Sequence, residues 1–262
     1  MLPETFWGRI QYLLQQYGSS FLSGAGNTMI IAIVGTFLGC LIGFIVGIIQ
    51  TIPVDKRDSA VKKTLVGFLK FIMACYVEFF RGTPMMVQAM FIYFGIAASL
   101  FGVKLNILTA GLLIITINTG AYMAEIVRSG IISVDDGQYE AAHSVGLSHW
   151  QTMKGIILPQ ALRNILPTIG NEFIINMKDS CVLSIIGVTE IFYTSQTIGG
   201  AMFNVGPPFL IASVIYLVLT LLTTRILALV QRKMDGSDHY ELLVDLDGSA
   251  YVSRLGKEGK NK

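Results

Sequence analysis

Apolar and polar stretches alternate along the chain in a pattern that predicts five membrane-spanning helices. Each apolar stretch holds about 20 residues or more, which is enough for a helix to cross a bilayer. The second stretch contains Lys70 and Glu78 and is interrupted near Arg81, Gly82 and Pro84, so we expect a long span that is broken at this point. The expected spans cover about residues 27–50, 64–100, 106–128, 160–192 and 207–231.

The first span and the segment before it carry two different patterns. Within the span, Gly35, Gly39, Gly43 and Gly47 recur every fourth residue and therefore share one face. A stripe of small residues lets a second helix approach closely in a membrane, so we expect helix packing on this face. Residues 1–20 instead place apolar side chains at helical spacing among polar ones, which predicts an amphipathic helix at the membrane interface.

Composition and charge agree with a multi-pass membrane protein. Apolar residues make up 53% of the 262 residues and charged residues only 14%, a balance unlike that of an average soluble domain. Lysine and arginine concentrate in the loop after the first span, which indicates a cytoplasmic loop. With five spans, the N-terminus then lies outside, and the polar loop at 138–159 and the C-terminus lie in the cytoplasm.

The sequence contains no pattern typical of catalysis or metal binding. Cys40, Cys75 and Cys181 lie far apart in apolar stretches, so we expect free thiols and neither a disulfide nor a metal site. The three histidines lie in polar loops without a neighbouring nucleophile. A GxxxxGK[ST] phosphate-binding loop is absent from the sequence, so we expect the chain itself to bind no ATP and no other cofactor.

The polar loop between the third and fourth spans predicts a docking element. Its core, residues 140–159, reads EAAHSVGLSHWQTMKGIILP and is amphipathic. Gly146 allows a close turn, and Pro159 is tolerated in the first turn of the helix that follows. We expect a helix–turn–helix outside the bilayer, in which the carboxylate of Glu140 stabilises the N-terminal end of the first helix.

This loop resembles the EAA loop of prokaryotic ABC importer permeases. The positions that match the family pattern are Glu140, Ala141, Ala142, Gly146, Ile156, Leu158 and Pro159. Three further segments look like the permeases that import polar amino acids, namely FFRGTPMMVQAMFIYFG (79–95), AYMAEIVRSGI (121–131) and KDSCVLSIIGVTE (178–190). The resemblance covers most of residues 20–232, with departures at Cys181, where related sequences usually carry a small polar residue, and in the charged tail.

The resemblance implies a fold and a set of partners. It implies an all-α integral membrane protein of the type I ABC importer kind, with a permease domain at 21–232, a coupling loop at 138–159 and a cytoplasmic tail at 233–262. Two ATPase subunits, which bind ATP and Mg, would receive the coupling helix. A second copy or a homologous permease would complete the pore, and an extracytoplasmic amino-acid-binding protein would deliver the substrate. The chain would lie in a prokaryotic cell membrane, in contact with lipid, and would bind no nucleic acid. The residues expected to dock on the ATPase are Glu140, Ala141, Ala142 and Gly146.

Polar residues inside the expected spans are the candidates for binding substrate, because charged groups in a bilayer are costly and face the protein interior. In the third span they occur at i, i+4 and i+7, and the same spacing returns in the fourth span. Each set therefore lies on one helix face, and the two faces predict a wet cavity near mid-depth. The candidate substrate-binding residues are Asn118, Tyr122, Glu125, Glu172, Asn176, Asp179 and Ser180.

These groups suggest how an amino acid would be held. A carboxylate such as Glu125 or Asp179 can pair with the ammonium group, while Asn118, Ser180 or a helix terminus can bind the other end. The excess of carboxylates favours a cationic or zwitterionic substrate. The alternative is that the polar groups satisfy one another, with Lys178 neutralising Glu172 or Asp179.

Residues at the expected break of the second span have two interpretations. Arg81, Gly82 and Pro84 can form a gate or a conformational hinge, because glycine and proline relax the helix there. Arg81 can equally extend its charged end to the cytoplasmic interface.

Two other classes of protein fit the sequence less well. An ion-coupled secondary amino-acid transporter would favour an inverted repeat and need no ATPase-docking loop, and no such repeat is visible in the sequence. A membrane enzyme would need a catalytic set, which the sequence does not offer.

In the tail, YELLVDLDGSAYV predicts a small hairpin around Asp247-Gly248.

Overall fold

The computed structural model describes residues 3, 5–54, 58–235, 240–244 and 250–254, with side chains as far as Lys233. The chain divides into two compact units, residues 1–222 and 223–262. Each unit is considered by itself, and α9 runs across their boundary.

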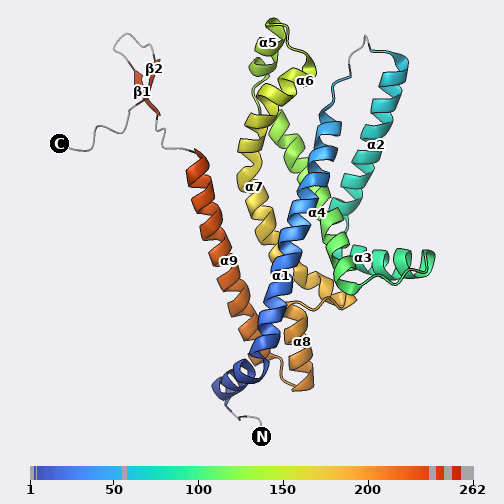
Figure 1. Cartoon of the computed structure of the whole chain (residues 1–262), viewed down its shortest axis with the longest axis vertical. Helices are drawn as coiled ribbons and strands as arrows, with labels where there is room; N and C mark the ends of the chain where they lie inside the picture. The colour runs from blue at the N-terminus through green and yellow to red at the C-terminus, as the bar shows by residue number, and fades with distance from the viewer. Residues whose placement is uncertain (1–2, 4, 55–57, 236–239, 245–249, 255–262) are drawn as a thin grey trace, which may run out of the picture. The chain divides into compact units, whose positions relative to one another are not determined.

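The described chain is mostly helical (Figure 1). The long helices are α1 (Phe6–Thr51), α2 (Ala60–Gly82), α4 (Ile107–Ile132), α7 (Leu158–Asp179) and α9 (Gly206–Asp235). The short helical elements are α3 (Met85–Met90), the π-helical η1 (Phe91–Leu100), α5 (Asp136–Ser144), α6 (His149–Thr152), the π-helical η2 (Met153–Ile157), the 3-10 turn η3 (Ser180–Ile186) and α8 (Ile191–Ala201). The helical fold predicted from the sequence is confirmed.

The number of spans agrees with the prediction if each bent pair of helices counts once. Helices α1, α4 and α9 are long and apolar enough to cross a membrane. Two further pairs pass the same test together, with a bend of 110° between α2 and α3 and a bend of 49° before α8. Among the described residues the total is then five, and the predicted break of the second span lies between Gly82 and Met85, as expected.

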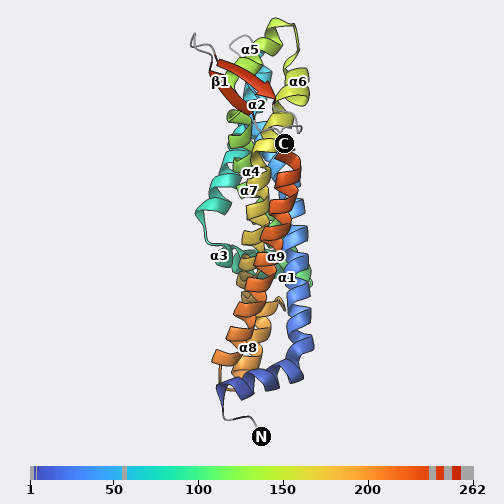
Figure 2. The ribbon, with the colours of Figure 1, turned by 90° about the vertical axis from the view of Figure 1, so that its left-hand side faces the viewer.

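The first helix is longer than the predicted span. The expected span at 27–50 lies within a single helix, because α1 runs without interruption from Phe6 to Thr51. Figure 2 shows that the first turns of α1 lie across the direction of the rest of the helix. The interfacial location of residues 1–20 stays a prediction.

The expected span at 160–192 is not one helix. Helix α7 ends at Asp179 and continues as the 3-10 turn η3, which stops at Gly187 with a backbone φ of 92°. Glycine occupies this left-handed conformation without the steric cost that other residues meet. Helix α8 then starts at Ile191 and is capped by Glu190, whose carboxylate accepts hydrogen bonds from the backbone N–H groups of Phe192 and Tyr193. The glycine and the cap together end one helix and begin another.

The glycine stripe of α1 packs against α4, as the sequence predicted. A β-carbon placed at Gly35 would lie 2.6 Å from Ile115 Cγ2, and one placed at Gly47 would lie 2.8 Å from Val127 Cβ. Because such contacts are too short for real β-carbons, only glycine allows the two helices to approach this closely. Buried aliphatic residues continue this contact towards α7, among them Ile131, Ile157, Ala161 and Ile165.

The second unit contains the end of α9 and a small sheet. Strands β1 (Tyr240–Val244) and β2 (Ala250–Arg254) pair in antiparallel register, with Tyr240 opposite Arg254 and Val244 opposite Ala250. The predicted hairpin is therefore confirmed for its strands. Its predicted turn at Asp247-Gly248 lies outside the described residues.

Candidate functional site

A cavity of about 460 Å³ lies between the α2–α3 break, α4, α7 and η3. Five of the seven predicted substrate-binding residues line it, and they are Asn118, Tyr122, Glu172, Asn176 and Asp179. The polar faces of α4 and α7 therefore line one space, and the binding of substrate by these residues stays a prediction. The remaining lining residues are Thr83, Pro84, Met85, Met86, Thr119, Ile175 and Val182.

The break between α2 and α3 forms one wall of the cavity. Thr83 is extended, with φ −123° and ψ 148°, because a residue that precedes proline is disfavoured in the helical region. Pro84 then starts α3 at 110° to α2. The buried side chain of Gln88 supports this turn, because its Nε2 lies 2.9 Å from the carbonyl oxygens of both Phe80 and Thr83.

Two of the predicted amides already have protein partners. Asn118 donates from Nδ2 to Gln88 Oε1 at 2.9 Å, which joins α4 to α3. Asn176 donates to Thr36 Oγ1 at 2.8 Å and accepts from Thr119 Oγ1 at 3.0 Å, which joins α7 to α1 and α4. For these amides the alternative interpretation, that polar groups satisfy one another, agrees with the structure.

The two carboxylates that line the cavity differ from the two amides in their contacts with other side chains. Glu172 is 8% exposed and Asp179 is exposed, and both line the same space from one face of α7. Within the described residues, neither carboxylate forms a hydrogen bond or an ion pair with another side chain, although the charge of Lys178 acts on Asp179 from a longer distance. A buried charge such as that of Glu172 is costly without a partner, so a cation that entered the cavity would be attracted to this wall.

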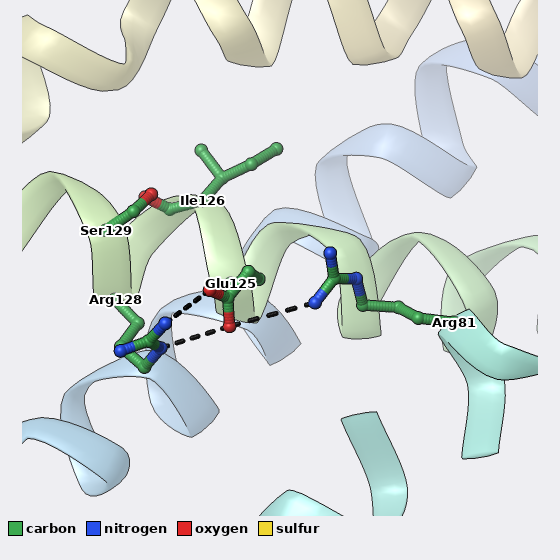
Figure 3. Close-up of polar contacts among 5 residues, drawn as sticks. All are labelled: Arg81, Glu125, Ile126, Arg128 and Ser129. Atoms are coloured by element: carbon green, nitrogen blue, oxygen red, sulfur yellow. Dashed lines mark hydrogen bonds and ion pairs between the residues drawn. The ribbon is translucent and has the colours of Figure 1, made fainter. Parts of the chain in front are cut away.

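Glu125 and Ser180, the other two predicted residues, are outside the set that lines the cavity. The carboxylate of Glu125 binds Arg128 through two contacts, Nε to Oε2 at 3.0 Å and Nη2 to Oε1 at 2.5 Å (Figure 3). Ser180 is fully buried and donates to the carbonyl oxygen of Met177 at 2.9 Å. Arg128 was missed in the sequence analysis, although its position three residues after Glu125 on a helix is typical of an ion pair.

Arg81 lies beside the cavity. Its Nη1 is 3.8 Å from Glu125 Oε2 (Figure 3), and its guanidinium lies 5.7 Å from the centre of the Tyr122 ring. Tyr122 lines the cavity, as do Thr83 and Pro84, which follow Arg81 closely in the chain. The structure therefore places a cation beside a cavity whose charged lining residues, Glu172 and Asp179, are both carboxylates. Gly82 is the last residue of α2.

The loop at 138–159 folds into two short helices, as expected. The first, α5, ends at Ser144 and is followed by Gly146, which has a φ of 81°. The backbone N–H of Leu147 donates to the carbonyl oxygen of Ala142 at 3.1 Å. The next helix, α6, starts with a capping box between Ser148 and Gln151. The loop is therefore a defined structure, with a left-handed glycine at its centre.

The expected role of Glu140 at the start of the loop helix is wrong. Helix α5 begins at Asp136 and is capped by Asp135, whose Oδ1 accepts from the backbone N–H of Gly137 at 2.7 Å. Glu140 lies in the middle of the helix, where its charge is too far from the N-terminal end to stabilise it much. Its side chain is exposed and available to a partner.

The loop holds its shape through contacts to the next helix and presents apolar side chains outward. Tyr139 donates to Met153 Sδ at 2.7 Å, and burial raises the pKa of the Tyr139 hydroxyl, so that it stays protonated as a donor. Ala142 is buried, whereas Val145 and Trp150 are 76% and 65% exposed. Exposed large apolar residues on a rigid polar loop are typical of a protein-docking surface.

Comparisons with known proteins agree with this geometry. Residues 60–236 match the model of a family described as "binding-protein-dependent transport system inner membrane component". The chain is 35% identical over 214 residues to the glutamine transport system permease protein GlnP of Escherichia coli, covering 81% of this chain and 92% of that one. It is 34% identical over 217 residues to the arginine transport system permease protein ArtQ of Bacillus subtilis, covering 83% and 93%.

Solved structures show the same fold. A crystal structure of an amino acid ABC transporter with histidines is similar with a TM-score of 0.74 and 34% identity, covering 88% of this chain and 99% of that one. An inward-facing structure of the MetNI methionine ABC transporter is similar with a TM-score of 0.63 at 17% identity, covering 81% and 96%. At that identity, the second likeness shows the fold alone.

Proposed function

The chain belongs to the family of binding-protein-dependent transport system inner membrane components, and from that premise we propose how it carries its substrate. It is a membrane-spanning permease of an amino-acid ABC importer, as its similarity to GlnP, ArtQ and a solved amino acid ABC transporter indicates. The substrate is a polar amino acid, which the permease moves into the cytoplasm by alternating access driven by a separate ATPase.

The cavity between the α2–α3 break, α4 and α7 is the observation that carries this proposal. Its volume of about 460 Å³ lies within the range of small-molecule sites. Glu172 and Asp179 face it without an ion-pair partner among the described residues, so they bind the ammonium group of the amino acid. The preference is for cationic or zwitterionic substrates, because an anionic side chain would be repelled by the same wall.

The loop at 138–159 couples the permease to its motor. We propose that Glu140, Ala141, Ala142 and Gly146 belong to the surface that seats in the ATPase, with the exposed Val145 and Trp150 beside them. Two ATPase subunits bind ATP and Mg, and this chain binds neither. When the motor closes, paired coupling loops move together, and the α2–α3 break at Gly82 and Pro84 is the hinge at which the cavity wall moves.

The assembly and its orientation follow from the same proposal. A second copy of the chain, or a homologous permease, completes the pore, and an extracytoplasmic binding protein delivers the amino acid. The coupling loop must face cytoplasmic ATP, so the N-terminus lies outside and the C-terminus in the cytoplasm of a prokaryotic cell. This orientation agrees with the basic loop after α1.

Uptake into vesicles tests the proposed function. The chain would be reconstituted with its ATPase and binding protein, and ATP-dependent uptake of labelled arginine, histidine, glutamine and glutamate would be measured. We expect uptake of at least one of these that stops when ATP is withheld. Uptake driven by an ion gradient without ATP would contradict the proposal and favour a secondary transporter.

A further inference from the structure

Arg81 carries a charged group beside the cavity that the proposed function does not yet use. It stands at the end of α2, is 40% exposed, and lies over the ring of Tyr122, which lines the cavity. The contacts of this guanidinium show whether the fold depends on it for stability.

The end of α2 does not need Arg81 as a cap. The last carbonyl groups of a helix lack partners within the helix, and a nearby arginine often supplies them. Here Thr83 Oγ1 donates to the carbonyl oxygen of Phe79 at 2.8 Å, and Gln88 and Asn118 donate to that of Phe80 at 2.9 Å and 3.3 Å. The carbonyl groups of Phe79 and Phe80 are therefore satisfied by side chains other than Arg81.

Glu125 does not need Arg81 either. The carboxylate of Glu125 receives two hydrogen bonds from Arg128, and with this partner its charge is already neutralised (Figure 3). The contact from Arg81 is a single one, at 3.8 Å, which is too long for a hydrogen bond. Both side chains are partly exposed, and a long ion pair of this kind contributes little to stability. Arg81 can leave Glu125 at small cost.

We infer that Arg81 binds the carboxylate group of the amino acid in the cavity. A polar amino acid carries an ammonium and a carboxylate, and the cavity offers a matching pair of charges. Glu172 and Asp179 line the cavity from α7, and Arg81 stands in the last turn of α2, over the ring of Tyr122, which also lines the cavity. The planar guanidinium binds a carboxylate through two parallel hydrogen bonds, a geometry that lysine cannot reproduce.

In this arrangement Glu125 does not bind the substrate. It competes with the carboxylate of the substrate for Arg81. Removal of the Glu125 charge frees Arg81, whereas removal of Arg128 leaves Glu125 with Arg81 as its one remaining arginine partner among the described contacts. The two substitutions are therefore expected to change substrate affinity in opposite directions. This inference rests on the proposed function, because it requires an amino acid in the cavity.

Equilibrium binding to the permease–ATPase complex, without the binding protein, tests the inference. The probes are arginine and glutamine, each compared with its carboxamide, argininamide or glutaminamide, which keeps the ammonium but lacks the carboxylate. We expect the normal complex to bind the amino acid about tenfold or more tightly than the amide, which is the range of a hydrogen bond to a charged group. In Arg81→Gln, affinity for the amino acid falls by about as much, while affinity for the amide is kept or rises.

Matched variants separate the role of Arg81 from a general effect. Arg163→Gln removes an exposed arginine of α7 that does not line the cavity, and it should leave both affinities unchanged. Glu125→Gln should bind the amino acid at least as tightly as the normal complex, and Arg128→Gln should bind it more weakly. Preserved binding of the amide shows that the cavity of each variant is intact.

Two results would overturn the inference. If Arg81→Gln still prefers the amino acid to its amide as strongly as the normal complex does, another group binds the carboxylate and the inference is wrong. ATP-driven uptake by the normal complex would in that case still support the permease function. If the normal complex shows neither binding nor ATP-driven uptake, the proposed function fails and the inference fails with it.

Discussion

Asn118 on α4 donates a hydrogen bond of 2.9 Å to Gln88 Oε1 on α3, and this bond joins two walls of the cavity. Gln88 is 2% exposed and uses its Nε2 to hold the carbonyl groups of Phe80, in the last turn of α2, and of Thr83, in the break itself. The break is therefore kept in shape by a buried amide pair, and its geometry depends on a residue that does not itself line the cavity.

Substitution of Gln88 tests this role. Gln88→Leu keeps a similar volume but leaves buried carbonyl and amide groups with fewer partners, which costs about 1–3 kcal/mol for each buried group. We expect the melting temperature of the solubilised complex to fall by at least about 5 °C, given the size of the domain. Gln196→Leu, at an exposed site of α8, is the control and should melt like the unchanged protein. Equal melting of both variants would show that the amide does not support the break.

Gly43 tests the packing of α1 on α4. A β-carbon at this position would collide with the Cβ of Met123, so Gly43→Ala forces the two helices apart. Overpacking of this kind costs about 1–3 kcal/mol. Gly26→Ala on the same helix meets no atom within 4 Å, and alanine favours the helix by up to about 1 kcal/mol. Thermal unfolding should show a loss for the first variant and none for the second, and the reverse order would contradict the packing.

Gly146 tests the coupling loop. Its φ of 81° is a left-handed conformation that β-branched residues rarely adopt, while open space surrounds the position where a Cβ would lie. We expect Gly146→Val to abolish ATP-driven uptake while membrane insertion stays normal, because the strain is confined to the loop. Gly146→Asn is the matched variant, since asparagine tolerates this conformation, and it should retain most of the uptake. Normal uptake by the valine variant would contradict the docking role of the loop.

Much of the fold can be predicted from local patterns. The glycine stripe of α1 predicts a closely packed partner, and α4 fills that place. The Gly82 and Pro84 pair predicts the break of the second span, because proline restricts the residue before it. Five of the six polar residues chosen by helical spacing meet in one cavity, since each set lies on one face of its helix.

The partners of the polar residues could not be predicted in the same way. Asn176 binds Thr36, which lies 140 residues away, and Asn118 binds Gln88, which lies 30 residues away. Nothing in the spacing within one helix shows which residue of another helix will face it. The end of the fourth span was missed for a different reason, since a glycine and a glutamate cap inside an apolar stretch give only a weak local signal.

The central claim is that the carboxylates of α7 bind the amino acid in the cavity, and selectivity of uptake tests it most directly. Uptake of labelled arginine, glutamine and glutamate would be measured with Asp179→Asn and with Glu172→Gln, each reconstituted with the ATPase and binding protein. Glu78→Gln removes an exposed carboxylate of α2 that does not line the cavity and is the control. We predict that arginine uptake falls about tenfold or more in the cavity variants, with ATP hydrolysis intact and glutamate no longer disfavoured. Uptake and selectivity equal to those of the control would contradict the claim and assign specificity to the external binding protein.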